Sequence, residues 1–226
     1  MEKKKMGFGK MIFISILIII LILILLLVAY TLRNYSIVKD LQNKIAPYKT
    51  SSNYHAEFFS TSADGTETKI NYYQKENKKA YFIERLESGE IIAKLSYYNN
   101  GERIDFFTET SGEKLAKLGE TFMPQVDIVN GLEMDDNMQM LVNCIISKIK
   151  KVEYQGRECY EIKAFHSPDV LYEDGEFAII IDKETGLNVK EYMGDSIFER
   201  TYEFDNVDDS IFIEPNIGEY KLQLNN

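Results

Sequence analysis

Histidines are the first side chains to consider for chemistry, and the sequence has only two, His55 and His166. His166 is followed by Ser167 and Asp169, which are the residue types of a hydrolytic triad. A triad depends on how three side chains are arranged in space, and neighbours in sequence do not supply that geometry. We therefore expect His166 to lie in a surface loop and His55 to face solvent. No catalytic residue is predicted, and an enzyme ranks behind the two binding functions given below.

An acidic group is the only candidate for metal chemistry. Asp205, Asp208 and Asp209 follow an apolar segment, but they lack the glycine and the distal glutamate of a calcium-binding EF-hand loop. We expect Asp208 and Asp209 to begin a short turn by accepting hydrogen bonds from backbone N–H groups. Glycine-rich phosphate loops and nucleotide-binding fingerprints do not occur in the sequence. The sequence therefore predicts no metal and no cofactor.

Cys144 and Cys159 are the only cysteines, and they do not form a Cys-x-x-Cys redox motif. In an oxidising compartment the two can form a disulfide if their Cα atoms lie within about 7 Å of each other. Two interpretations stay open, a disulfide between Cys144 and Cys159 or two free, buried thiols.

Methionines are concentrated in the middle of the chain, beside a helical pattern. They are Met123, Met134, Met138 and Met140. Helical spacing places Met134, Met138, Leu141 and Ile145 on one face of a helix. Packing of this face in the core explains the pattern. A second interpretation makes the helix the lid of an apolar cavity, because methionine adapts to varied apolar partners.

An uncharged apolar run extends from Met11 to Ala29. As a helix its length is about 28 Å at ~1.5 Å per residue, close to the roughly 30 Å of a bilayer's hydrocarbon core. A cleaved signal peptide has a shorter apolar core, about 7–15 residues, and ends in a small-x-small site. Leu27-Val28-Ala29 has a bulky residue in the first of these positions. The run predicts an uncleaved membrane anchor, with cleavage near Ala29 as the alternative.

Charge divides the chain near residue 30. The first thirty residues contain four lysines against Glu2, a balance of about +3, and because the whole chain carries −10 the remainder carries about −13. The positive-inside rule keeps the lysine cluster in the cytoplasm and places residues 31–226 outside it. A domain this acidic repels phosphate backbones and anionic head groups, so we expect no nucleic-acid partner and no broad contact with an anionic membrane.

Behind the anchor the apolar period changes. Ile37, Leu41 and Ile45 recur every four residues and predict an amphipathic helix that Pro47 ends. From there the period is two, as in half-buried strands. The alternating residues include Tyr54, Ala56, Phe58, Ile70, Tyr72, Leu95, Tyr97, Ile104, Phe106, Ile162, Ile179 and Ile181.

Turn signals between these segments, such as Asn100-Gly101, indicate hairpins. No segment between them is long enough for a crossover helix, so the sheet is predicted to be antiparallel. We expect about ten strands, with a break from Thr110 to about Asn130 that is followed by the middle helix. One apolar face of such a sheet must be covered, and only the two helices are available.

Three short runs resemble the superfamily of lipoprotein carriers with the LolA/LolB-like fold, which includes RseB-like sensors. The runs are Tyr154-Gln155-Gly156-Arg157-Glu158-Cys159-Tyr160, Ile181-Asp182-Lys183-Glu184-Thr185-Gly186-Leu187, and Tyr202-Glu203-Phe204-Asp205-Asn206-Val207 with Phe212 and Pro215 after it. The resemblance covers about residues 36–223. It implies an incomplete barrel with an apolar mouth, lidding helices and a cavity for a lipid or acyl chain. Because a tethered chain cannot shuttle, it implies docking or sensing rather than transport.

The sequence as a whole predicts a mainly β (α+β) protein, a transmembrane helix followed by a long antiparallel half-barrel-like sheet covered by about two helices. Its segments are a cytoplasmic tail (1–10), an anchor (11–30), a juxtamembrane helix (31–46) and an extracytoplasmic LolA-like domain (47–226). We expect a single-pass protein of the plasma membrane in a bacterial cell envelope.

Two functions follow from this organisation. The first is a binding module that holds a lipid, an acyl chain or a lipidated partner in an apolar concavity. Its predicted lining consists of Tyr72, Leu95, Phe106, Met138 and Ile179. The alternative is a structural or regulatory subunit that binds another envelope protein and has no small-molecule ligand.

Overall fold

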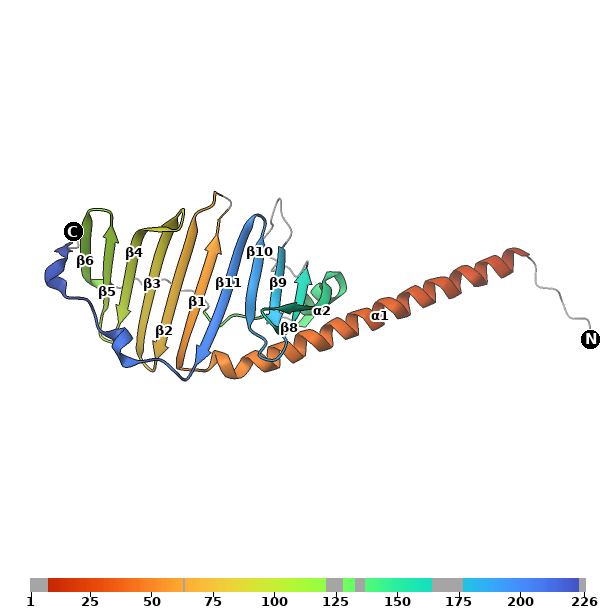
Figure 1. The fold of residues 1–226 in the computed structure, drawn as a ribbon. Coiled ribbons are helices and arrows are strands. Elements are labelled where there is room, and N and C mark those ends of the chain that lie inside the picture. The colour runs from red at the N-terminus through yellow and green to blue at the C-terminus, as the bar shows by residue number, and fades with distance from the viewer. Residues whose placement is uncertain (1–7, 63, 121–127, 133–136, 164–176, 224–226) are drawn as a thin grey trace, which may run out of the picture.

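The computed structural model describes residues 8–62, 64–120, 128–132, 137–163 and 177–223. They form a twelve-stranded open sheet, a long N-terminal helix and a short second helix (Figure 1). The strand order is β12-β6-β5-β4-β3-β2-β1-β11-β10-β9-β8-β7. Neighbouring strands are antiparallel except β12 and β6, which are parallel. The predicted fold class is therefore confirmed.

The helices and strands have the following bounds. They are α1 (Phe8–Lys49), β1 (Asn53–Thr61), β2 (Glu67–Lys75), β3 (Lys78–Glu87), β4 (Glu90–Asn99), β5 (Ile104–Thr110), β6 (Glu113–Glu120), α2 (Asn137–Ile146), β7 (Lys148–Tyr154), β8 (Arg157–Lys163), β9 (Phe177–Asp182), β10 (Asn188–Met193), β11 (Ser196–Phe204) and β12 (Lys221–Leu222), with short 3-10 helices η1 (Asp209–Phe212) and η2 (Ile217–Glu219) before β12.

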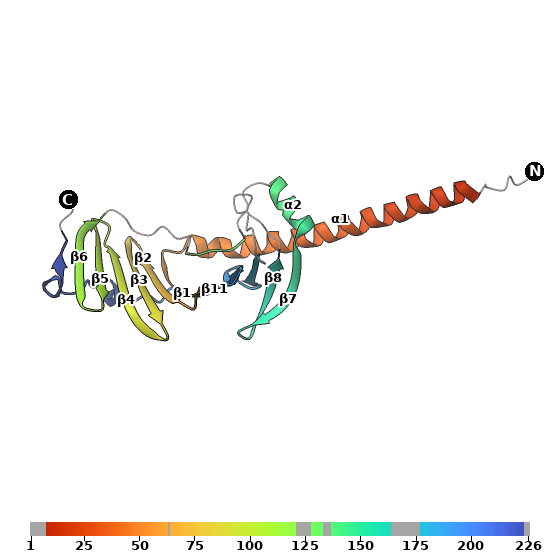
Figure 2. The ribbon, with the colours of Figure 1, turned by 90° about the horizontal axis from the view of Figure 1, so that it is seen from above.

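Helix α1 joins the predicted anchor and the predicted amphipathic helix without a break. Its N-terminal part extends beyond the sheet and exposes its apolar side chains, and it is long and apolar enough to cross a membrane (Figures 1 and 2). Its C-terminal part lies against the sheet, where Val38, Leu41 and Ile45 are buried. The sequence predicted that Pro47 ends the helix, and this is wrong, because Pro47 lies in its last turn. Only one backbone hydrogen bond near the helix end is lost there.

Strand β6 corrects a second prediction, because it lies inside the expected break that begins at Thr110. Leu115, Ala116 and Leu118 are adjacent or nearly so and do not alternate over a full strand, which hides the period of two. The strand pairs with β5 and is joined to it by a turn in which Gly112 has a φ of +104°.

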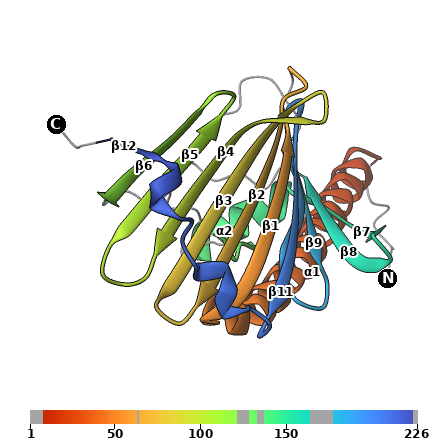
Figure 3. The same ribbon diagram turned by 60° about the vertical axis from the view of Figure 1, so that its left-hand side comes forward.

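The two faces of the sheet are covered by different segments. We call the face that carries Ala56, Tyr72 and Tyr81 the inner face, and the opposite one the outer face. Along β3 to β6 the outer face is covered by the C-terminal segment, where Phe212 and Tyr220 pack against a cluster that includes Phe107 (Figure 3). The inner face is covered by α1, α2 and residues 128–132, and it carries the candidate site.

Candidate binding site on the inner face

The inner face is a row of aromatic side chains that run across neighbouring strands. The strand register pairs Ala56 with Tyr72, Tyr72 with Tyr81, and Tyr81 with Tyr97. Ring centroids lie 6.2 Å apart for Tyr72 and Tyr81, and 6.1 Å for Tyr81 and Tyr97. Such spacings are within the range of favourable edge-to-face and tilted aromatic pairs. The row continues to Phe106, whose ring lies 4.5 Å from that of Tyr97.

Two separate groups of residues cover this face. Over β7 to β9, side chains from α1 and α2 pack on the sheet, and Leu41, Met140 and Ile179 belong to one buried cluster. Over β1 to β3, the segment 128–132 lies across the tyrosine row, and Ile128 is buried there. Its position is fixed by a hydrogen bond of 2.9 Å from the backbone N–H of Asn188 to the carbonyl of Asn130.

A cavity of about 300 Å³ remains between β1, β2, β3, β11 and residue 130. Its apolar walls are Phe58, Ile70, Tyr81 and Phe198, and its polar groups come from Ser60, Asn130 and Arg200. A pocket with apolar walls and few polar groups is the usual form of a small-molecule site, and this volume is at the lower end of the range of about 300–1,000 Å³.

Arg200 is the charged residue of this cavity. On β11 it follows the alternation of Phe198, Tyr202 and Phe204, so its side chain lies on the aromatic face. Its Nη2 atom lies 2.8 Å from the Glu191 carboxylate on β10, and the two side chains are only 11% and 13% exposed. Its guanidinium lies 5.7 Å from the centroid of the Phe58 ring. A buried charge requires such pairing, because desolvation of an isolated ion is costly.

The ion pair with Glu191 does not provide hydrogen-bond acceptors for all of the N–H groups of the Arg200 guanidinium. Nε and Nη1 of Arg200 are buried and have no hydrogen-bond partner among the described residues, and the same holds for Oδ1 of Asn188. Asn188 is adjacent to this pair, because its Nδ2 lies 3.4 Å from Glu191 Oε2. Buried N–H groups normally have a partner, and leaving one unpaired costs about 1–3 kcal/mol. Among the described residues, these donors therefore have unused hydrogen-bonding capacity beside the cavity.

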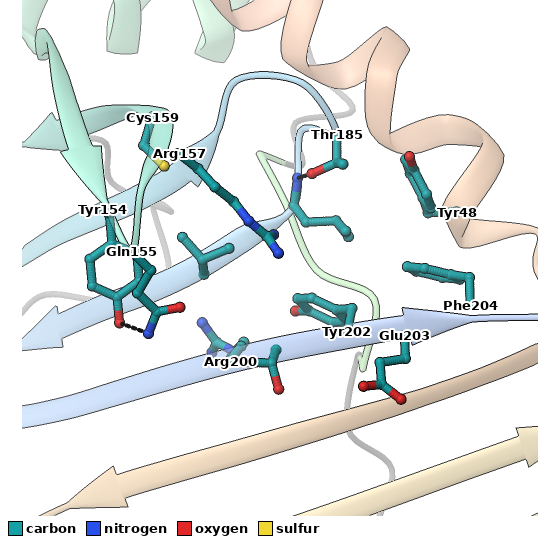
Figure 4. Close-up of a pocket in the computed structure, with 13 residues that line it drawn as sticks. Tyr48, Tyr154, Gln155, Arg157, Cys159, Thr185, Arg200, Tyr202, Glu203 and Phe204 are labelled. Atoms are coloured by element: carbon teal, nitrogen blue, oxygen red, sulfur yellow. Dashed lines mark hydrogen bonds between the residues drawn. The ribbon is translucent and has the colours of Figure 1, made fainter. Parts of the chain in front are cut away.

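A second pocket, of about 290 Å³, adjoins the first at Arg200 (Figure 4). It forms where β10 and β11 separate. Strand β11 pairs with β10 only from Ser196 to Glu199, and residues 200–204 pair with β1 on one side and lie beside other segments on the side of the pocket. Those segments are the β7–β8 turn, the β9–β10 turn and Tyr48 of α1. The pocket is mixed in character, with Arg157, Gln155 and Thr185 beside the rings of Tyr202 and Phe204.

Tyrosine hydroxyls around this pocket are held in the neutral form. Burial, together with the hydrogen bond of 2.9 Å from Tyr154 to Glu199, raises the pKa of Tyr154 to about 12. Burial also raises the pKa of Tyr202 to about 12. The pocket therefore offers neutral hydroxyls and arginine N–H groups, which suit uncharged or partly charged oxygen acceptors.

The predicted lining residues are only partly brought together. Tyr72, Leu95, Phe106 and Ile179 lie on the inner face, as their strand registers require. Tyr72 and Ile179 are buried in two different clusters, and none of the five residues lines the 300 Å³ cavity. Met138 is 67% exposed and lies on the outward face of α2.

The helical stripe around Met138 does not pack in the core, contrary to the prediction. Leu141 and Ile145 were expected to face the core, but they are exposed with Met138, whereas Met140 and Cys144 are buried. The helix is apolar on both sides, so the sequence spacing alone does not decide which side packs. Met123 and Met134 lie outside the described residues.

The other candidate residues have structural surroundings. Cys144 and Cys159 are free, buried thiols that belong to different hydrophobic clusters, so the structure does not bring them together, and burial raises the pKa of both. Asp208 caps η1 by accepting a hydrogen bond from the N–H of Ser210, as predicted, whereas Asp209 pairs with Lys75. His166, Ser167 and Asp169 lie outside the described residues.

His55 is on the outer face, as expected, but it is not simply solvated. Its ring is stacked on that of Tyr73 at a centroid distance of 4.2 Å, and its Nε2 lies 3.0 Å from the side-chain oxygen of Asn71. The side chain is 20% exposed. These contacts hold the imidazole between strands β1 and β2 on the side away from the cavity.

Sequence reasoning missed Arg200, although a signal was present. In the series Phe198, Arg200, Tyr202, Phe204, a single cation occupies one position of a period-two aromatic pattern. A charged residue on the apolar side of a strand is placed in the interior by the same alternation that places the rings there. It therefore marks a buried ion pair or a ligand contact.

No protein-family model and no curated protein sequence matches the chain. Two solved structures are similar in outline. An uncharacterized conserved protein from Thermus thermophilus has 10% identity and a TM-score of 0.44, over 82% of this chain and 98% of that one. A DUF1329 family protein from Desulfovibrio piger has 10% identity and a TM-score of 0.32, over 81% and 97%. At these values the likeness assigns neither a family nor a function to the chain.

Proposed function

We propose that this protein is a membrane-anchored binding module whose sheet domain holds one acyl chain, linked through an ester or amide carbonyl, in the cavity beside Arg200. The observation that carries the proposal is the pair of buried, unpartnered donors, Nε and Nη1 of Arg200, at an apolar cavity. The walls supply an environment for hydrocarbon, and the guanidinium supplies the polar contact that orients the ligand.

The size of the cavity favours a single chain. A volume of about 300 Å³, with Phe58, Ile70 and Phe198 among the walls, is small for a lipid with two chains. Apolar burial contributes about 25 cal/mol per Å² of surface removed from water, so a single chain that fills the cavity gains most of its affinity from the walls.

The charge balance favours a neutral carbonyl over a carboxylate. Glu191 already neutralises Arg200 at 2.8 Å, so a carboxylate ligand would leave a net negative charge in a buried site. A carbonyl oxygen accepts the free N–H groups without adding charge. Acyl esters occur in membrane lipids, and acyl amides and esters occur in lipidated proteins, so either can supply this group.

The anchor determines where such a module acts. Helix α1 has the length and composition to cross a membrane, and the lysines before it favour a cytoplasmic N-terminus with the sheet domain outside. A tethered module receives its ligand at the surface of its own membrane, from a lipid or from a lipidated envelope protein. The role we propose is docking or sensing of acylated partners, without catalysis and without a cofactor.

The experiment uses the full chain in lipid nanodiscs and a photoactivatable acyl methyl ester with the reactive group in its chain. After illumination, crosslinked peptides are mapped by mass spectrometry. We expect crosslinks in β1, β2 and β11 in addition to α1, which contacts the bilayer and serves as an internal control. Methyl palmitate is expected to compete better than palmitic acid at neutral pH, and hexadecane less well than either.

A pair of variants separates the cavity from general partition into lipid. Ser60→Leu fills the cavity, whereas Thr61→Leu makes the same kind of change on the opposite face of β1. Crosslinks to β1, β2 and β11 should fall in the first variant and persist in the second. Crosslinks confined to α1 in the unmodified protein would contradict the proposal and favour the alternative, a subunit that binds an envelope protein.

A further inference from the structure

Helix α2 is apolar on the side that faces away from the protein. Leu141, Val142, Ile145 and Ile146 are 38%, 50%, 44% and 49% exposed. With Met138 they have the spacing i, i+3, i+4, i+7 and i+8, which places all five on one face of a helix. The opposite side, with Met140 and Cys144, is buried against the protein. The helix therefore has two apolar faces, one that packs in the core and one that is exposed.

This composition is unusual for a helix in contact with water. A surface helix normally presents charged or polar side chains on its outward side, and α2 contains no charged residue at all. A contiguous exposed apolar patch marks a surface that meets a membrane or a protein. The position of α2 decides between these two occupants.

Contacts with α1 fix α2 beside the end of the apolar span. The Tyr30 hydroxyl donates a hydrogen bond to the carbonyl of Ser147, directly after α2. The Asn34 side chain donates two, to the carbonyl of Cys144 at 2.9 Å and to that of Ser147 at 3.1 Å. Tyr30 follows Ala29, the last residue of the predicted apolar run Met11–Ala29. Figures 1 and 2 show α2 beside α1, at the end of the sheet from which α1 extends.

The distances agree with a location in the head-group region. Asn34 lies five residues beyond Ala29, about 7.5 Å along a helix axis at ~1.5 Å per residue. The polar layer on each side of the hydrocarbon core is roughly 5–8 Å thick. Interfacial helices bury their apolar face about 5–10 Å into this boundary. A helix held at residues 30–34 therefore reaches the layer without any change in the fold.

The charges at this end of the domain also favour a membrane. Strand β7 is the edge of the sheet on this side, and Lys148, Lys150 and Lys151 are exposed on it. Arg33 of α1 is exposed as well and lies next to β7, with 3.4 Å between its Nη2 and the carbonyl of Ile149. The outer part of the chain carries a net negative charge, so these four basic residues give this end a local charge of the opposite sign. Basic groups at this position are attracted to anionic lipids.

We propose that α2 is an interfacial membrane helix, which rests its exposed apolar face in the head-group region of the bilayer that α1 crosses. The inference rests on the anchoring part of the proposed function and is independent of the acyl cavity. The sequence predicted no broad contact of the domain with an anionic membrane. The contact proposed here is a local one, confined to α2 and the edge strand β7. With α1 and α2 both engaged, the domain has a fixed orientation above the membrane.

The chain contains no tryptophan, so one introduced tryptophan reports a single position. Three variants of the full chain are compared in vesicles of phosphatidylcholine and phosphatidylglycerol that carry brominated acyl chains. Val142→Trp tests α2, Leu21→Trp reports the anchor, and Ile213→Trp, at a side chain that is 72% exposed near the C-terminus, reports solvent. We expect strong quenching at residue 21, clear quenching and a blue-shifted emission at residue 142, and neither at residue 213.

The outcomes are distinguishable. Quenching at residue 21 without quenching at residue 142 would overturn the interfacial position of α2 and leave the anchor intact. A blue-shifted but unquenched tryptophan at residue 142 would also overturn it, because a protein surface would then cover α2. No quenching at residue 21 would refute the anchor itself, and with it the membrane part of the proposed function. Crosslinking of the acyl ester to the cavity is a separate readout.

Discussion

Arg200 and Glu191 lie on neighbouring strands with 2.8 Å between Nη2 and Oε2, and the two side chains are 11% and 13% exposed on the inner face. The carboxylate oxygen that accepts from Arg200 also lies 3.4 Å from the side-chain amide of Asn188. The two charges thus depend on each other, because each side chain is only slightly exposed to solvent. This pair is the most specific chemical feature of the described residues.

Removal of one charge of the pair Arg200–Glu191 is expected to lower the free energy of unfolding more than removal of both charges. Glu191→Leu leaves the guanidinium buried and uncompensated and should lower the free energy of unfolding by about 3–5 kcal/mol. The double variant Glu191→Leu with Arg200→Met removes both charges and should recover most of that loss. The measurement is unfolding by denaturant in detergent micelles, followed by circular dichroism. The coupling would be contradicted if the stability lost in the double variant equals the summed losses of Glu191→Leu and Arg200→Met measured separately.

Gly186 is expected to be essential for the packing of α1 on the β9–β10 turn. It has a φ of +74°, and a Cβ at this position would lie 2.3 Å from the carbonyl oxygen of Leu41. Gly186→Ala therefore combines the cost of a left-handed conformation, about 1–2 kcal/mol, with a clash against helix backbone. Gly156→Ala is the matched control, because its φ is +76° and nothing lies within 4 Å of the added Cβ. Equal losses of stability in the two variants would show that the clash is relieved.

Much of the fold could be predicted because its sheet follows local rules. The residues that alternate in the sequence, such as Tyr72, Tyr97 and Ile179, lie on one face of the sheet as a period of two requires. The turn after β9 also follows from its residues. The Asp182 carboxylate accepts hydrogen bonds from the N–H groups of Glu184 and Thr185, and Gly186 supplies the positive φ.

The candidate site could not be predicted, because it depends on contacts between distant parts of the chain. Arg200 is buried only because β10 supplies Glu191 and because Asn130 lies over the strands. The packed side of α2 belongs to a cluster with Val38 and Leu41 of α1, which are about one hundred residues away in sequence. An apolar pattern on two sides of a helix contains no information about which side meets which neighbour. Contacts between residues far apart in sequence determine both the burial of Arg200 and the side of α2 that packs.

Asn34 is expected to hold α2 on α1. It is fully buried, and its amide donates to two backbone carbonyls at the end of α2. Asn34→Leu keeps the branched shape of the side chain but removes the donor to the Cys144 carbonyl, while the Ser147 carbonyl keeps the Tyr30 hydroxyl; the loss should lower stability by about 1–3 kcal/mol. The local effect is measured as faster maleimide labelling of Cys144, a buried thiol, in a Cys159→Ser background. Asn43→Leu, an exposed position on the same helix, should leave labelling unchanged. Unchanged labelling in both variants would mean that α2 is held by other contacts.

Alkaline pH is expected to destabilise the domain through its buried tyrosines. The pKa of Tyr154 is raised to about 12 by burial and by its hydrogen bond to Glu199, and that of Tyr202 is raised to about 12 by burial. A tyrosine in the unfolded chain ionises near pH 10. Between about pH 10 and 12 the unfolded state therefore binds fewer protons than the folded state, and stability falls as the pH rises. Below this window the two states bind equal numbers of these protons, so the tyrosines impose no pH dependence there.

Denaturant unfolding at a series of pH values between about 8 and 11, followed by tyrosinate absorbance, tests this expectation. The denaturation midpoint should be level at first and then decline, and the ionisation of Tyr154 and Tyr202 should appear together with unfolding. Tyr202→Phe removes one titrating group and keeps the ring on the inner face, so its decline should be shallower than that of the unmodified protein. The contribution of Tyr202 is the difference in tyrosinate absorbance between the unmodified protein and Tyr202→Phe, because the chain has 15 tyrosines. If this difference appears near pH 10 while the fold persists, the Tyr202 hydroxyl reaches solvent, and its neutral, buried state would then be wrong.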